Sequence, residues 1–183
     1  MKYLICISGA SGSIYGIRCV QELNKSGHEI HLIVSEGAKK ILQHETSYTY
    51  DYLKTQARIV YENSDVFAGP SSGSFPLDGM VVIPCSMKTL SSVAHGLSDT
   101  LMSRAATCCL KEGKKVILVP RETPFDNAGI KNMLAAKENG AVILPAMPAF
   151  YHKPRRIEDL VDFIVGKIFD QLGLQHSLFT RWE

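Results

Sequence analysis

Residues 2–34 read KYLICISGASGSIYGIRCVQELNKSGHEIHLIV, and this stretch decides the fold. The run KYLICIS (2–8) is almost purely apolar, which is typical of a strand buried on both faces. In residues 13–27 apolar side chains recur every three positions, which predicts an amphipathic helix that ends at Gly27. A second apolar run follows at 29–34, so the stretch is predicted to be a strand–helix–strand unit with parallel strands.

The same alternation continues along the chain. Further strands are predicted at 79–84, 115–119 and 141–145. Further helices are predicted at 37–45, 127–138, 156–172 and 86–112, the last with a break near Gly96. Residues 47–66 fit neither pattern, and the Gly-, Ser- and Pro-rich residues 68–79 predict a loop. The predicted fold class is α/β, a three-layer, doubly wound parallel sheet in one Rossmann-like domain over residues 1–183.

The composition excludes several classes of function. The 183 residues are 45% hydrophobic and 21% charged with a net charge of +2, which predicts neither nucleic-acid nor membrane-surface binding. No apolar stretch approaches the ~20 residues of a membrane span, and the apolar start passes directly into a glycine turn, so no signal peptide is expected. The 5 cysteines form no CxxC pair and the 6 histidines show no metal-ligand spacing. We therefore expect reduced thiols, a cytoplasmic location and no metal site.

Ligands of doubly wound sheets bind beyond the carboxyl ends of the strands. The segments that follow the predicted strands are rich in small, polar and proline residues: SGASGS (8–13), Ser35-Glu36, PCSMKT (84–89), PRETPF (120–125) and PAMPAFY (145–151). These segments are the candidates for binding and catalysis.

The first turn carries glycines at 9, 12 and 16, in the spacing GxxGxxxG. Small residues let backbone N–H groups approach a phosphate at the start of a helix, where the helix dipole favours an anion. The spacing is neither the dinucleotide fingerprint GxGxxG nor a P-loop. It predicts a phosphate site, with a tight turn that binds no ligand as the alternative.

The turn after the third predicted strand has the same character. Ser86 is expected to cap the following helix, with Lys88 as a cation, and a capped helix with a solvent-facing lysine is the alternative. Cys85 has no histidine near it in the sequence, which favours a small buried side chain over a nucleophile. Two such turns favour a mononucleotide such as FMN over NAD, because Ser35 stands where an acidic residue would bind the NAD ribose and Glu36 comes only afterwards.

The turn after the fourth strand places Arg121 and Glu122 between two prolines, which restrict the backbone. Arg121 offers a planar fork for an anion or for flavin carbonyl oxygens. Glu122 can take or give a proton. Neighbours on an extended turn point to different sides, so the two need not pair with each other. An exposed surface turn is the alternative.

Seven motifs in this order resemble the UbiX-type flavin prenyltransferases, including the members that belong to hydroxyarylic acid decarboxylase systems. The motifs are SGASG (8–12), SSGSF (71–75), IPCSMKTL (83–90), SDTLMSRAA (98–106), VPRETP (119–124), PAFYHKP (148–154) and FDQLGL (169–174). The resemblance covers residues 2–182.

The resemblance implies a flavodoxin-like fold that assembles into a homo-dodecamer with sites between subunits. It implies transfer of a dimethylallyl group from dimethylallyl phosphate to N5 and C6 of reduced FMN. The prenylated FMN would then pass to a partner decarboxylase of the UbiD type.

The same resemblance implies roles for individual residues. It implies that FMN contacts Gly9, Ala10, Ser11, Ser35, Ser86, Met87, Lys88, Thr89 and Arg121. It implies that the prenyl phosphate meets Lys111, Arg121, Tyr151 and Lys167. The implied catalytic residues are Ser11, Glu122 and Arg104, of which Ser11 and Glu122 would manage protons.

Two departures and two alternatives accompany this interpretation. Lys167 stands where many members have arginine, which replaces a fork with a point charge, and Ser8 stands where a threonine is common. One alternative is a flavin-dependent decarboxylase of an aromatic acid or of a peptidyl cysteine, although Tyr15 stands where the latter would place a histidine. The other alternative is a non-catalytic flavin carrier, which would have no need of Glu122.

Overall fold

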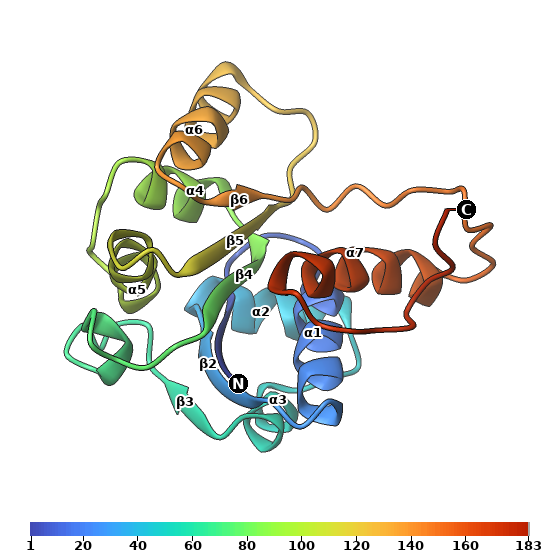
Figure 1. Cartoon of the computed structure of the whole chain (residues 1–183), viewed down its shortest axis with the longest axis horizontal. Coiled ribbons are helices and arrows are strands. Elements are labelled where there is room, and N and C mark those ends of the chain that lie inside the picture. The colour runs from blue at the N-terminus through green and yellow to red at the C-terminus, as the bar shows by residue number, and fades with distance from the viewer. Residues whose placement is uncertain (183) are drawn as a thin grey trace.

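The computed structural model describes residues 1–182, which form a layered α/β fold (Figure 1). The strands are β1 (Lys2–Ile7), β2 (Glu29–Val34), β3 (Ile59–Tyr61), β4 (Gly79–Cys85), β5 (Lys115–Pro120) and β6 (Val142–Ile143). The α-helices are α1 (Ser13–Lys25), α2 (Glu36–Glu45), α3 (Tyr50–Gln56), α4 (Met87–Ala94), α5 (Leu101–Lys111), α6 (Asn127–Glu138) and α7 (Ile157–Leu172). A short 3-10 helix covers Gly69–Ser71.

All six strands belong to one sheet in the order β3-β2-β1-β4-β5-β6, and every neighbouring pair is parallel. The chain winds outward from β1 to β3, returns beside β1 as β4, and winds outward again to β6. The order therefore reverses between β1 and β4, which is where such sheets open a crevice for ligands. The predicted doubly wound parallel sheet is confirmed.

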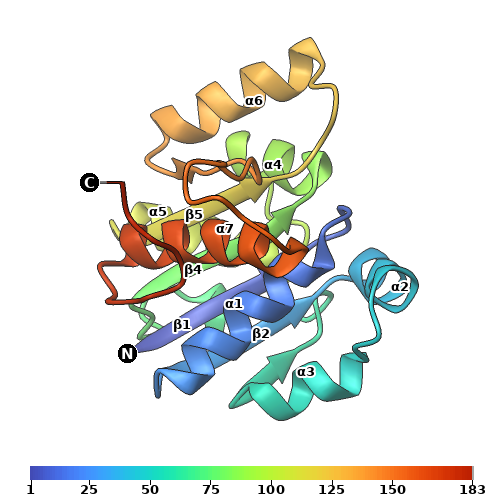
Figure 2. The same ribbon diagram turned by 90° about the vertical axis from the view of Figure 1, so that its right-hand side faces the viewer.

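Side chains of β1 alternate between two apolar cores, one on each face of the sheet. Tyr3, Ile5 and Ile7 pack with apolar residues of α1 and α7. Leu4 and Cys6 point to the opposite face, toward apolar residues of α4 and α5. Figure 2 shows α1 and α7 lying across the strands, with α4 and α5 on the far side of the sheet. Burial on both faces explains why the strands are apolar at every position.

Three elements differ from their predicted extent. Residues 47–66 contain α3, which Thr49 caps by accepting a hydrogen bond from the Tyr52 N–H at 3.1 Å, and the short edge strand β3. The strand predicted at 141–145 contains only Val142 and Ile143. The Leu144 and Ala146 N–H groups still donate to the Leu118 and Pro120 carbonyl oxygens of β5, at 2.9 and 3.0 Å, so the chain continues beside β5 after the regular strand ends. The predicted break near Gly96 is confirmed, because α4 ends at Ala94 and α5 begins at Leu101.

None of the helices in residues 1–182 has the length and apolar character that crossing a bilayer requires.

Candidate active site

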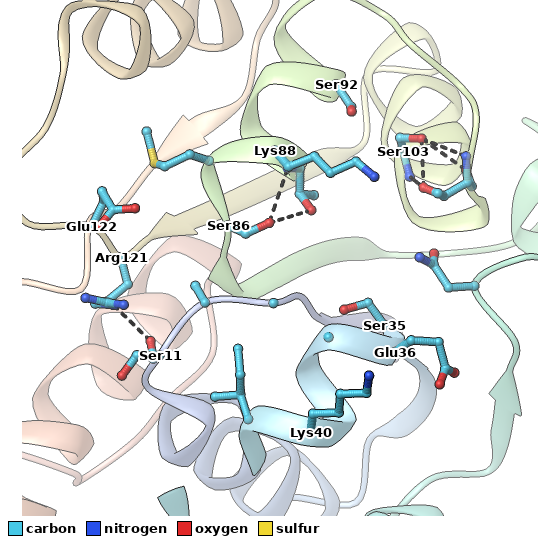
Figure 3. Close-up of a pocket in the computed structure, with 18 of the residues that line it drawn as sticks. Ser11, Ser35, Glu36, Lys40, Ser86, Lys88, Ser92, Ser103, Arg121 and Glu122 are labelled. Atoms are coloured by element: carbon cyan, nitrogen blue, oxygen red, sulfur yellow. Dashed lines mark hydrogen bonds between the residues drawn. The ribbon is translucent and has the colours of Figure 1, made fainter. Parts of the chain in front are cut away.

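A cavity of about 1150 Å³ lies at the carboxyl ends of β1, β2, β4 and β5 (Figure 3). Arg121 and Glu122 lie at one end of it, and Ser35 and Glu36 lie toward the other. Every residue predicted to contact FMN lines this cavity, as does Glu122: Gly9, Ala10, Ser11, Ser35, Ser86, Met87, Lys88, Thr89, Arg121 and Glu122. The parallel order of the strands brings four turns together that are up to 112 residues apart in the sequence, from Gly9 to Arg121.

Ser8 holds the first of these turns against the third. Its buried hydroxyl donates to the Pro84 carbonyl oxygen at 2.9 Å and accepts from the Ser86 N–H at 2.7 Å. The bond to Ser86 fixes the residue that caps α4 relative to the end of β1. A hydroxyl at position 8 therefore has a structural task in positioning the rim of the cavity.

Three helices begin at the cavity with a hydroxyl side chain that caps their first turn. Ser35 accepts from the Ala38 N–H at 3.2 Å, Ser86 from the Thr89 N–H at 3.3 Å, and Thr100 from the Ser103 N–H at 3.3 Å. All three capping residues line the cavity. The positive ends of α2, α4 and α5 therefore face one space, where their N–H groups can bind an anion, although Glu36, Glu62 and Asp99 line the same space.

The α5 terminus is a part of the site that the sequence did not predict. Thr100 and Ser103 line the cavity, and their side chains form a capping box. The pattern Thr-Leu-Met-Ser is visible in the sequence, but α5 follows no strand directly. A prediction that looks for ligand-binding residues only at the ends of strands therefore does not include the α5 terminus.

Glu45 occupies the start of α1, which corrects the predicted phosphate site at that turn. Its carboxylate accepts from the Gly12 N–H at 2.8 Å and from the Ser13 N–H at 3.1 Å. Partial burial acts to raise the pKa of Glu45, but hydrogen bonds from the Ser11 hydroxyl and these two N–H groups hold it below its ordinary value. An anion bound in the cavity must therefore use the other helix termini.

The sequence contains no signal that would identify Glu45. It lies 33 residues after Gly12 and belongs to a different helix. Only the packing of α2 beside the first turn brings its carboxylate to the α1 terminus.

Arg121 and Glu122 take different partners, as expected. The Arg121 Nε–H donates to the Ser11 carbonyl oxygen at 3.1 Å, which leaves the outer nitrogens of its guanidinium without a protein acceptor in residues 1–182. Glu122 accepts from the Thr123 N–H at 3.0 Å and is exposed in the single chain. The cavity thus offers one oriented fork and one solvent-accessible carboxylate at the same end.

Cys85 has the structural character predicted for it. The side chain is fully buried, and burial raises the pKa of its thiol far above the ordinary value. A protonated thiol is a poor nucleophile, so Cys85 contributes packing at the base of this turn.

The flavoprotein family profile matches residues 1–169 of the chain. A flavin prenyltransferase UbiX of Methanocaldococcus jannaschii is 45% identical over 182 residues, which cover 100% of this chain and 98% of that protein. This chain belongs to the UbiX family of flavin prenyltransferases. A probable UbiX-like flavin prenyltransferase of Sedimentibacter hydroxybenzoicus is 47% identical over 184 residues, covering 100% of this chain and 97% of that one.

Solved structures of the UbiX family superimpose on nearly the whole chain. A UbiX crystallised with FMN and dimethylallyl pyrophosphate is 41% identical with a TM-score of 0.97, covering 100% of this chain and 97% of the other. A dodecameric FMN-dependent UbiX-like decarboxylase of Escherichia coli O157:H7 is also 41% identical with a TM-score of 0.97, covering 100% of both chains.

Four residues that the UbiX resemblance assigned to the site lie outside the cavity of their own chain: Arg104, Lys111, Tyr151 and Lys167. Arg104 donates to the Ser71 carbonyl oxygen at 3.2 Å, Lys111 lies 3.9 Å from the Glu112 carboxylate, and Lys167 lies 3.1 Å from that of Asp170. Tyr151 is carried on residues 144–156, an arm that projects away from the sheet (Figure 1). A single chain therefore gathers the predicted FMN contacts but not the full set of predicted phosphate ligands.

Proposed function

We propose that this chain is a flavin prenyltransferase that transfers a dimethylallyl group from dimethylallyl phosphate to reduced FMN. The observation that carries this proposal is the cavity at the β1–β4 reversal, where three capped helix termini, Arg121 and Glu122 meet in a UbiX-family chain. The cavity also has the volume expected of a site for a mononucleotide and a small second substrate.

The residues of the cavity suit FMN at both of its ends. The capped termini of α2 and α5 would hold the FMN phosphate, because their backbone N–H groups and helix dipoles meet at one end of the cavity, while the α4 terminus lies between them and Arg121 (Figure 3). The free nitrogens of Arg121, at the opposite end, would bind carbonyl oxygens of the isoalloxazine ring. FMN that spans the cavity in this way would place its isoalloxazine ring at the end where Glu122 lies.

The chemistry needs an anion to leave and a proton to move. Reduced FMN supplies the nucleophilic N5 and C6 when it is bound. The allylic C–O bond breaks and its electron pair leaves with the phosphate, while a bond from N5 to the allyl group forms. Lysine and arginine side chains neutralise the departing phosphate, and one well-placed donor contributes about 3 kcal/mol to lowering such a barrier.

Glu122 would accept the proton that N5 loses. The Ser11 hydroxyl, which donates to Glu45 in this structure, would relay the proton by turning toward Glu122. The carbonyl oxygen that orients Arg121 is that of Ser11 itself, so one residue positions both the guanidinium and the relay hydroxyl.

We propose that neighbouring subunits supply the missing phosphate ligands. Four residues with predicted roles lie outside the cavity of their own chain: Lys111, Tyr151, Lys167 and Arg104. A homo-oligomer, which we expect to be a dodecamer, would complete each site. Large exposed apolar side chains support an assembly of this kind, among them Phe67 at 93%, Phe150 at 70% and Ile157 at 73% exposure.

The proposal extends to the destination of the product. Prenylated FMN would be handed to a UbiD-type decarboxylase, since a modified flavin that remained here would block further turnover. Five cysteines without disulfide partners favour a reducing compartment such as the cytoplasm.

The decisive experiment gives the purified protein reduced FMN and dimethylallyl phosphate under anaerobic conditions and weighs the flavin by mass spectrometry. We expect a mass gain of one five-carbon unit, and no gain when dimethylallyl phosphate is omitted. Unchanged FMN would refute the proposal. If an aromatic acid were then decarboxylated by the protein alone, the decarboxylase interpretation would replace it, and FMN binding without either reaction would indicate a flavin carrier.

A further inference from the structure

The last residues of the described chain fold back along α7. Gly173, in the left-handed conformation with φ 74°, ends the helix, and residues 174–182 then run toward the arm at 144–156 (Figure 1). We call residues 174–182 the C-terminal segment. Gly166 leaves room for this segment on α7, because a Cβ at that position would lie 2.5 Å from the Phe179 ring and 2.7 Å from the His176 ring.

Asp170 ties the C-terminal segment to α7. Its carboxylate accepts from Lys167 Nζ at 3.1 Å, from His176 Nε2 at 3.2 Å and from Arg181 Nη2 at 2.7 Å. The Leu178 N–H donates to His176 Nδ1 at 3.2 Å, so the ring proton is on Nε2 and points to Asp170. One carboxylate therefore orients two cations and a histidine from both sides of the turn.

Asp170 is ionised at neutral pH. Partial burial acts to raise the pKa of Asp170, but hydrogen bonds from Arg181, Lys167 and His176 outweigh it and lower the pKa to about 2. With Asp170 ionised, the cluster of Lys167, Arg181 and Asp170 keeps one net positive charge.

The far end of the C-terminal segment reaches the arm. The Trp182 ring lies edge-on to the Tyr151 ring at 5.5 Å, and Tyr151 lies edge-on to Phe163 of α7 at 5.7 Å. Trp182 is 76% exposed, and the Arg181 side chain is 58% exposed. Tyr151, which belongs to the predicted phosphate ligands together with Lys167, therefore contacts the residue next to Arg181.

We propose that Arg181 is a further ligand of the prenyl phosphate, and that Asp170 is the positioning residue that holds Arg181 beside Lys167. This inference rests on the proposed function. Asp170 accepts from both terminal nitrogens of Arg181, from Nη2 at 2.7 Å and from Nη1 at 3.4 Å. The Nε–H has no acceptor in residues 1–182, and each terminal nitrogen carries a second N–H, so donors remain for phosphate oxygens. Lys167 alone would present a point charge, whereas the pair presents a fork and a point charge held by one carboxylate.

The first test compares Arg181→Gln with Arg155→Gln, an exposed arginine of the arm whose side chain has no acceptor in residues 1–182. We expect Arg181→Gln to raise the KM for dimethylallyl phosphate roughly 10- to 100-fold, since a hydrogen bond to a charged group contributes on this scale. The Kd for FMN stays within about twofold, Arg181→Lys restores part of the loss, and Arg155→Gln is unaffected. An unchanged KM for Arg181→Gln, or an equal loss of FMN affinity, overturns the inference.

The second test concerns Asp170 and Gly166, the glycine of α7 against which the C-terminal segment packs. Asp170→Asn should raise the same KM, and the double variant Asp170→Asn/Arg181→Gln should be no more than about twofold worse than Arg181→Gln, because the two residues act as one unit. Gly166→Ala leaves all charges in place but displaces the segment, and should also raise the KM. If the increases in KM were additive in the double variant, Asp170 would not act by positioning Arg181.

Failure of the inference can be separated from failure of the proposed function. If the wild-type protein makes no prenylated FMN, the proposed function fails, and a ³¹P NMR titration with inorganic phosphate still tests the site. We expect Arg181→Gln to weaken phosphate binding relative to Arg155→Gln, and equal affinities in that titration would overturn the assignment of Arg181.

Discussion

At the scale of single residues, Glu45 and Glu122, two of the five carboxylates that line the cavity, differ in what holds them. Glu45 accepts two backbone N–H groups at the start of α1, whereas Glu122 accepts only the N–H of its neighbour Thr123. Glu45 is therefore bound to the scaffold, and Glu122 keeps acceptor capacity for a substrate. Different effects are expected when each is replaced by glutamine.

Glu45→Gln should lower the free energy of unfolding at pH 7 by about 0.5–1 kcal/mol, because it removes a negative charge from a helix N-terminus near the surface. The pKa of Glu45 is lowered in the folded chain, so its contribution is present above the ordinary pKa of a glutamate and is lost as the pH falls through the folded value. Urea unfolding at pH 7 and pH 4 measures this, with Glu138→Gln, an exposed carboxylate of α6, as the control. Equal destabilisation at both pH values would contradict the charge argument.

Glu122→Gln should slow prenyl transfer roughly 100-fold or more, because a positioned proton acceptor contributes about 10²–10⁴-fold. The Kd for reduced FMN should change little, since the amide keeps the size of the side chain. Anaerobic single-turnover measurements at saturating dimethylallyl phosphate separate the chemical step from binding. A rate equal to that of the wild type would exclude Glu122 as the proton acceptor.

At the scale of elements, α1 lies directly on the sheet because Gly16 has no side chain. A Cβ on Gly16 would lie 2.5 Å from the Ile83 carbonyl oxygen of β4 and 3.0 Å from the Ile7 side chain. The carbonyl belongs to the backbone of a central strand, so it cannot move aside cheaply.

Gly16→Ala should therefore reduce the free energy of unfolding by about 1–3 kcal/mol, the usual cost of overpacking. Gly9→Ala is the matched control, because its Cβ would have neighbours no closer than 3.7 Å. Chemical denaturation of both variants provides the comparison. Equal stability of the two would show that α1 can shift outward without loss.

The contact between α7 and the C-terminal segment should depend on pH in the acid range. The folded pKa of Asp170 is about 2, below its ordinary value of 3.8, so its stabilisation is present above about pH 4 and is lost as the pH falls from 4 toward 2. Asp170→Asn should lower the free energy of unfolding by about 1–2 kcal/mol at pH 7, a figure that allows for screening by solvent because Asp170 is partly exposed. The difference in stability from wild type should shrink in acid. Asp51→Asn removes an exposed pair with Lys54 and should cost almost nothing. A pH-independent difference for Asp170→Asn would contradict this account.

At the scale of the whole molecule, the arm and α7 carry groups that their own cavity does not use. If a neighbouring subunit completes each site, Glu122→Gln and Lys167→Gln chains should complement one another. Mixed oligomers refolded from equal amounts should recover about one quarter of the wild-type activity, because about that fraction of sites would combine two intact contributions. Each variant refolded alone is the control, and a mixture no more active than these controls would place both residues in one chain.

The sequence could predict most of the fold and one half of the site. Apolar runs and their spacing placed five of the six strands, and the rule for strand ends indicated Ser35, Ser86 and Arg121. Strand β3 was not predicted because an edge strand of three residues has too short a pattern. The α1 terminus was interpreted as a phosphate site because nothing local shows that Glu45 already occupies it.

What the sequence by itself determined is what depends on neighbouring residues: the layered α/β fold, the turns at the strand ends, the Ser86 cap and the burial of Cys85. Only the tertiary structure decided which groups meet across long separations, namely Glu45 with Gly12, the α5 terminus with the cavity, and Asp170 with Arg181. The physical reason is the range of the interactions. Periodicity and capping act within a few residues and leave a mark in the local sequence, whereas a hydrogen bond between distant side chains depends on how whole elements pack.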